Sequence, residues 1–182
     1  MRITRSFVSR AALGATMVVG LVAVTAAGKS TTTSRTAMFG GPWISIETPV
    51  NPYVASATGG LFVVHTWVHQ NPSDLPVTGR AEGLVDGKRR SVSFKPASTG
   101  QMGTYVVRPE WGNKGIWTVL VTAMPEAKNG WSIQAVVDVG ANGEIEKVSV
   151  PRAGHTPRLL TDADVERGLQ DRAKAMLAVS AR

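Results

Sequence analysis

Short segments with alternating apolar residues follow one another from Trp43 onward, and clusters of Gly, Pro, Asn and Asp separate them. This spacing is typical of an all-β sandwich or barrel. Asp86-Gly87 and Asn142-Gly143 supply the positive φ angles of tight hairpin turns, so they predict two antiparallel hairpins, 79–85/88–95 and 132–139/144–150. The complete set of expected strands is 42–48, 61–69, 79–85, 88–95, 103–108, 116–123, 132–139 and 144–150.

The alternation within one strand predicts which side chains point inward. In residues 116–123, one face carries Trp117, Val119, Val121 and Ala123, whereas the other carries Thr118 and Thr122 among apolar neighbours. Strands of this kind are half buried, as in a sandwich of two layers. We therefore expect Trp117 to lie in the core.

The N-terminus has the pattern of a targeting segment. Three arginines and no acidic residue occur in the first ten positions, an uncharged run follows over 11–24, and small residues occupy 25–27. This order is typical of a secretory signal peptide over residues 1–27, and the run is too short for a permanent anchor. We expect a protein of the periplasm or the cell exterior that contacts the membrane only through an uncleaved signal segment. A flexible tail over 28–41 would follow the cleavage site.

The C-terminal part, residues 151–182, combines a turn-rich connector with a helical pattern. Thr161 is a suitable N-cap residue, and Val165, Leu169, Ala173 and Met176 recur at helical spacing. A helix is therefore predicted at about 162–178. Because its apolar stripe is short, we expect an appendage whose removal leaves the sandwich folded; the alternative is a helix packed permanently on the sandwich.

Charge and cysteine content limit the class of partner and the way in which the fold can be stabilised. The formal net charge of +7 falls to +4 once the three signal arginines are removed, and the basic residues are not gathered as they are in nucleic-acid-binding proteins. We expect no nucleic acid partner. The chain has no cysteine, so packing alone must hold the mature domain together.

One part of the chain resembles a known family. Gly103-Thr104-Tyr105, Trp111 and the segment 115–119 (Gly-Ile-Trp-Thr-Val) are similar to the recurring strands of the FixH-like and YtkA-like exported bacterial domains. The resemblance covers roughly residues 42–140. It implies an immunoglobulin-like antiparallel β-sandwich, here over 42–150, in an envelope or periplasmic setting with loose links to metal handling and respiratory-complex assembly. It brings no catalytic motif.

Two histidines raise the question of a metal site. His65 and His69 would share a face of one strand about 13 Å apart, which is too far for one ion to bridge. A site would need Met102, Met124, His155 or a carboxylate beside one of them, and methionine with histidine suits copper. We expect no cofactor, with copper as the alternative.

Catalytic patterns are missing from the sequence. No serine lies in a nucleophile-elbow pattern, and there is no cysteine to activate. The carboxylate pairs Glu82 with Asp86 and Glu144 with Glu146 lie beside predicted turns, where solvated charges are ordinary. We therefore do not expect an enzyme.

Two sets of residues are candidates for contacting a partner. Lys88, Arg89 and Arg90 form the densest basic run, which either protects a sheet edge from aggregation or docks an acidic partner. Trp111 and Trp131 lie in Gly- and Asn-rich segments, where an exposed indole could anchor a partner. The sequence thus favours an exported, non-catalytic binding or assembly module with an unknown envelope protein partner. The alternative is a copper-binding accessory protein of the periplasm.

Overall fold

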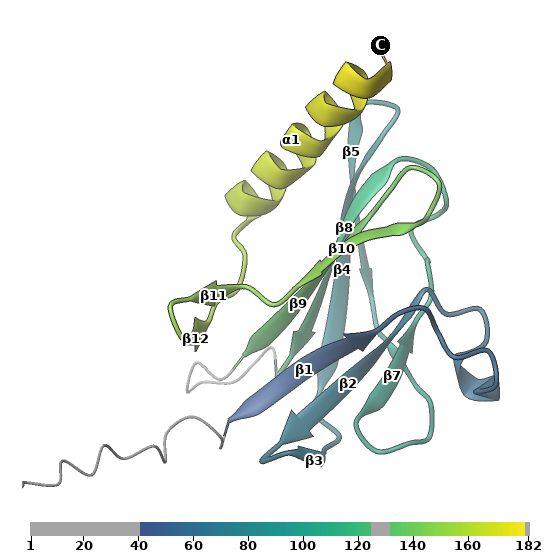
Figure 1. Ribbon diagram of the computed structural model, residues 1–182, viewed down its shortest axis with the longest axis vertical. Coiled ribbons are helices and arrows are strands. Elements are labelled where there is room, and N and C mark those ends of the chain that lie inside the picture. Colours follow the sequence, from purple (N-terminus) through teal and green to yellow (C-terminus); the bar gives the residue numbers. More distant parts are fainter. Residues whose placement is uncertain (1–40, 125–131, 181–182) are drawn as a thin grey trace, which may run out of the picture. The chain divides into compact units, whose positions relative to one another are not determined.

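The computed structural model describes residues 41–124 and 132–180. The predicted signal peptide, the tail up to residue 40 and Trp131 lie outside the described residues. Within the described part, the chain forms two antiparallel β-sheets and one C-terminal helix (Figure 1). The prediction of an all-β sandwich with a C-terminal helix is confirmed.

The first sheet has the strand order β1-β2-β7-β6, and β3 also pairs with β2. A short 3-10 helix, η2 (Ala55–Ala57), lies between β1 and β2 in the chain. The strands of this sheet are β1 (Pro42–Glu47), β2 (Phe62–Val68), β3 (Asn71–Pro72), β6 (Ala97–Ser98) and β7 (Thr104–Val107).

The second sheet has the order β10-β9-β8-β4-β5, and the neighbouring strands run antiparallel. Its strands are β4 (Val77–Val85), β5 (Lys88–Phe94), β8 (Ile116–Ala123), β9 (Ile133–Val139) and β10 (Ile145–Ser149). A separate small hairpin of β11 (Arg152–Ala153) and β12 (Thr156–Pro157) follows, in a connector that we expected to hold no strand.

Both predicted hairpins are present. β4 and β5 join through Asp86 and Gly87, which both have positive φ, at 51° and 72°. The β9–β10 hairpin is longer than a two-residue turn, because Val139 pairs with Ile145 and the loop comprises residues 140–144. Within it Gly143 has a positive φ of 83°, whereas Asn142 does not.

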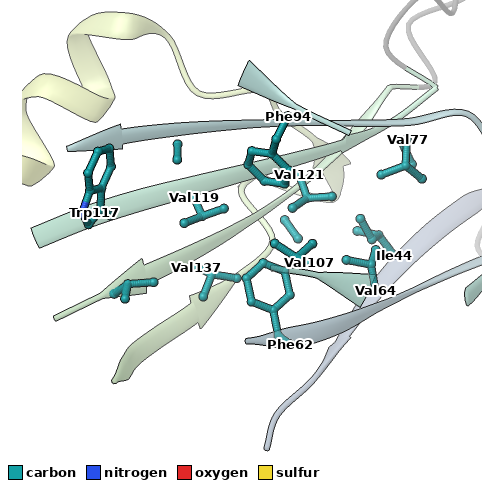
Figure 2. Close-up of a cluster of buried hydrophobic side chains, with 14 of the residues drawn as sticks. Ile44, Phe62, Val64, Val77, Phe94, Val107, Trp117, Val119, Val121 and Val137 are labelled. Atoms are coloured by element: carbon teal, nitrogen blue, oxygen red, sulfur yellow. The ribbon is translucent and has the colours of Figure 1, made fainter. Parts of the chain in front are cut away.

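The core lies between the two sheets. Phe62 and Val64 of β2 meet Val119, Val121 and Val137 of the second sheet, and Figure 2 shows these side chains interleaved. Trp117 is 2% exposed, which confirms its predicted place in the core. Gly83 lies opposite Trp117 on β4, and a Cβ at this glycine would come within 2.3 Å of the indole. A larger residue at position 83 would therefore displace Trp117.

Helix α1 (Asp162–Ser180) packs on the outer face of the second sheet (Figure 1). Val165 and Leu169 are buried there against apolar side chains of three strands, namely Ile116, Leu120, Val136 and Leu84. The helix is thus packed on the sandwich, which was the alternative, and the expectation that strand 116–123 is half buried is wrong. β8 is buried on both faces because the helix covers the side that carries Thr118.

The predicted N-cap of the helix is confirmed. The Thr161 hydroxyl accepts a hydrogen bond from the Asp164 main-chain N–H (3.2 Å), and the Asp164 carboxylate accepts one from the Thr161 N–H (3.0 Å). This reciprocal pair is a capping box. Among the residues that the structure describes, no helix has the length and apolar character needed to cross a membrane.

Polar contacts also fix α1 to the sheet. The Arg172 guanidinium donates to the main-chain oxygens of Val139 (2.7 Å) and Trp117 (3.0 Å) and to the Glu146 carboxylate (2.7 Å). Its side chain is largely buried, so these acceptors replace the water that the charge has lost. The helix is thus held by both apolar and charged contacts.

Candidate functional site

The outer face of the first sheet differs from that of the second. The alternation of β1 and β2 turns Ile44, Ile46, Phe62 and Val64 inward, so Trp43, Ser45, Glu47, Val63, His65 and Trp67 face outward. The segment around η2 covers one half of this face, where Val50, Val54 and Ala57 pack on Val63 and Val106. We call the other half, made of Trp43, Ser45, Glu47, His65 and Trp67, the open half.

Two indoles dominate the open half. Trp43 and Trp67 are directly opposite each other on β1 and β2, with ring centroids 5.0 Å apart and planes inclined by 8°. The Trp67 Nε1–H donates to the Ser45 hydroxyl at 3.3 Å, which fixes the inner ring. Trp43 is 40% exposed, so this strand edge presents a large apolar ring to solvent.

His65 connects three strands of the first sheet. Its Nε2 lies 2.8 Å from the Glu47 carboxylate on β1, and its Nδ1 lies 3.4 Å from the Thr104 hydroxyl on β7. Both ring nitrogens therefore already have partners. A cavity of about 30 Å³ lies beside them, lined also by Thr99 and Gln101. This space suits a water molecule rather than an organic ligand.

His69 and Met102, the other predicted metal ligands, differ in their position relative to His65. His69 lies beyond the end of β2 with a φ of 49°, so it does not continue the strand face of His65. Met102 is 64% exposed, and its main-chain oxygen accepts a hydrogen bond from the same Thr104 hydroxyl that lies beside His65. Within 41–124 and 132–180, no three His, Cys, Asp or Glu side chains group as metal ligands.

Trp111 is not an exposed anchor, contrary to our prediction. It is 8% exposed and packs between Phe94 and Trp117, with centroids 5.3 Å and 6.3 Å away. The segment after β7 folds back over one end of the sandwich, which takes the indole into the core. Trp111 and Trp117 line an open cavity of about 280 Å³ there, together with Asn113 and Asn142.

The basic run is divided by strand alternation. It lies on β5, an edge of the second sheet, as the edge-protecting interpretation expects. Arg89 pairs with Glu82 (3.2 Å) and with Glu166 of α1 (2.7 Å), so it holds the helix. All three residues are exposed, but Lys88 and Arg90 lie on the other face of the strand from Arg89. The three side chains therefore do not lie on one face, and Arg89 is already paired with carboxylates.

A groove of about 870 Å³ lies between β1 and the β11–β12 hairpin. Pro42, Trp43 and Ile44 line one wall. The remaining lining residues include Ile133, Val150, Arg152, His155, Thr156 and Pro157. The volume falls in the range of ligand pockets. Sequence reasoning did not find this groove, because it depends on how the connector folds back toward β1.

Comparison of the chain with protein-family models, with curated proteins and with solved structures finds no match. The open half and the groove must therefore be interpreted from their own geometry.

Proposed function

We propose that this chain is an exported, non-catalytic binding module of the periplasm or cell envelope. It binds a protein partner through the open half of the first sheet and the adjoining groove. One observation carries the proposal: the Trp43–Trp67 stack lies at the rim of a groove and leaves Trp43 exposed. Tryptophan is enriched among the residues that contribute most to protein–protein affinity.

The surroundings of the Trp43–Trp67 stack support a role in binding a partner rather than in packing the fold. The second sheet buries its outer face with a helix, but Trp43 has one ring face against Trp67 and borders the groove. A stacked indole loses little side-chain freedom when a partner covers it, so little entropy opposes binding. The export part of the proposal rests on the signal-peptide pattern of residues 1–27 and on the resemblance to the FixH-like and YtkA-like domains.

The test is a crosslinking pull-down from envelope extract with the full chain and two variants. Trp43→Ala should lose at least about nine-tenths of a specifically crosslinked partner, as expected of a hot-spot residue. Leu177→Ala removes an exposed apolar side chain from α1 and should retain the partner. Near-ultraviolet circular dichroism and the melting temperature verify that both variants fold. Equal recovery with Trp43→Ala and wild type would contradict the proposal.

A further inference from the structure

The strand edges of the two sheets are protected unequally. β5 carries Lys88, Arg89 and Arg90, and β10 carries Glu146 and Lys147. β3 and β6 are only two residues long. β1, at an edge of the first sheet, has six residues, and its one charged residue is Glu47, which is bonded to His65. Charges and short strands keep edges from pairing with other chains, and β1 has these devices only at its ends, where Pro42 begins the strand.

Hydrogen bonds of β2 show which main-chain groups of β1 face outward. The Thr66 N–H donates to the Gly103 oxygen (2.8 Å), and the Thr66 oxygen accepts from the Ser73 N–H (3.0 Å). Both groups of Thr66 thus point away from β1, so the pair Ile44–Thr66 is not hydrogen-bonded. Because hydrogen-bonded and non-hydrogen-bonded pairs alternate in an antiparallel ladder, Ile44 and Ile46 direct their N–H and C=O groups away from β2. Within 41–124 and 132–180, no strand pairs with β1 on that side. Ser45 directs its own toward β2.

The groove lies along this edge at Ile44, and residues of the β11–β12 hairpin form part of its other wall. Arg152 and His155 line the groove, and among the residues that the structure describes no acidic side chain lines it. The Arg152 guanidinium donates to the His155 main-chain oxygen at 3.2 Å, which positions it beside the groove. The charge of this wall favours an acidic occupant.

We propose that an extended, acidic peptide segment of a protein partner adds to the first sheet as a strand beside β1. Its main chain pairs with Ile44 and Ile46, an apolar side chain contacts Trp43, and a carboxylate pairs with Arg152. Strand addition of this kind takes affinity from main-chain hydrogen bonds and specificity from alternate side chains. This inference rests on the proposed function and names the chemistry of the partner.

The test is amide hydrogen exchange followed by NMR on the full chain, with a synthetic probe. The probe is an eight-residue capped peptide in which valine and glutamate alternate. We expect the Ile44 and Ile46 amides to exchange fast without the peptide and roughly tenfold more slowly at about nine-tenths occupancy, since only the free fraction exchanges. The Ser45 amide, bonded to β2, should be slow in both states and serves as an internal control.

Two further probes separate the parts of the inference. A peptide with N-methyl groups on alternate residues cannot pair along one edge, so it should bind at least about tenfold more weakly. Arg152→Glu should reverse the preference from the valine–glutamate peptide to a valine–lysine peptide. Lys147→Glu makes the same charge change on β10 and should leave the preference unaltered.

Several results would overturn the inference. Binding without protection of Ile44 and Ile46, or equal binding of the methylated peptide, would exclude strand pairing. Slow exchange at both amides before peptide is added would show that the edge is already covered. No binding of the acidic peptide would also reject it. None of these outcomes changes the Trp43→Ala pull-down, whose failure alone counts against the proposed function.

Discussion

The outer faces of the two sheets are used in opposite ways. On the second sheet, α1 buries Ile116, Leu120 and Val136, and charged side chains fix the helix in place. On the first sheet, the segment around η2 covers only one half, and Trp43 and Trp67 stay at the surface of the other. The comparison shows that α1 closes one apolar face, whereas the other face keeps Trp43 partly exposed.

Removing the helix should have the largest effect. A chain cut after Val150 would expose Ile116, Leu120 and Val136 on a central part of the second sheet. We expect molten or insoluble protein, which dye binding and loss of the near-ultraviolet circular dichroism would detect. A truncated chain that stays soluble with a cooperative melt would mean that α1 is not needed to close this face.

The second-largest effect should be the difference in stability loss between a tryptophan of the core and one of the open half. Trp117→Ala empties a packed site in the core and should lower the free energy of unfolding by about 3–5 kcal/mol. Trp43→Ala removes a partly exposed ring at a strand edge and should cost less than about 1 kcal/mol. Denaturant unfolding of both variants checks this. Similar losses would show that the open half is part of the folding core.

Within the helix, position decides the cost of a substitution. Leu169 is fully buried on the second sheet, so Leu169→Ala should cost about 2–5 kcal/mol. Leu177 is 72% exposed two turns later, and Leu177→Ala should change stability by less than about 0.5 kcal/mol. Thermal or denaturant unfolding measures both. A large loss at Leu177 would require a contact that extends along the whole helix.

The smallest expected effect is on how the melting temperature changes at acidic pH. Hydrogen bonds from the Thr161 main chain and hydroxyl, with Arg158 nearby, lower the pKa of Asp164 from 3.8 to about 2. A lowered pKa in the folded state means that the ionised carboxylate stabilises the helix above pH 4, and that this contribution is lost as the pH falls toward 2. The melting temperature of Asp164→Asn should therefore fall less steeply across this interval. Asp171→Asn controls for the loss of one carboxylate from the same helix.

The sequence predicted the eight longer strands well because each carries its own signal, but it did not predict the two-residue strands β3, β6, β11 and β12. Residues 116–123 alternate cleanly, and Asp86-Gly87 fixes the first hairpin locally. Trp111 was misplaced because its Gly- and Asn-rich surroundings resemble an exposed loop, although the segment folds back onto Phe94. The packing of α1 was given only as an alternative because the apolar stripe of the helix is short, and because one face of residues 116–123 carries Thr118. In the structure, its hydroxyl is satisfied by the Asp138 carboxylate at 2.8 Å.

The candidate site was harder to predict, for a physical reason. Trp43 and Trp67 are far apart in the chain and meet only through the register of β1 on β2, which no local pattern specifies. Likewise, Arg152 reaches the groove because the connector turns back after β10. The one signal available was that Trp43, Ser45 and Glu47 share a face, as do His65 and Trp67.

Arg172 has a consequence for the order in which the chain can fold. It reaches the main chain of Trp117 from 55 residues further along, and contacts of such separation form late. The ribosome makes α1 after every strand of the second sheet, so the outer face of this sheet stays unclosed until the helix has been synthesised. A nascent chain that lacks α1 therefore cannot reach its final packing. Chains truncated before α1 should thus be degraded by proteases.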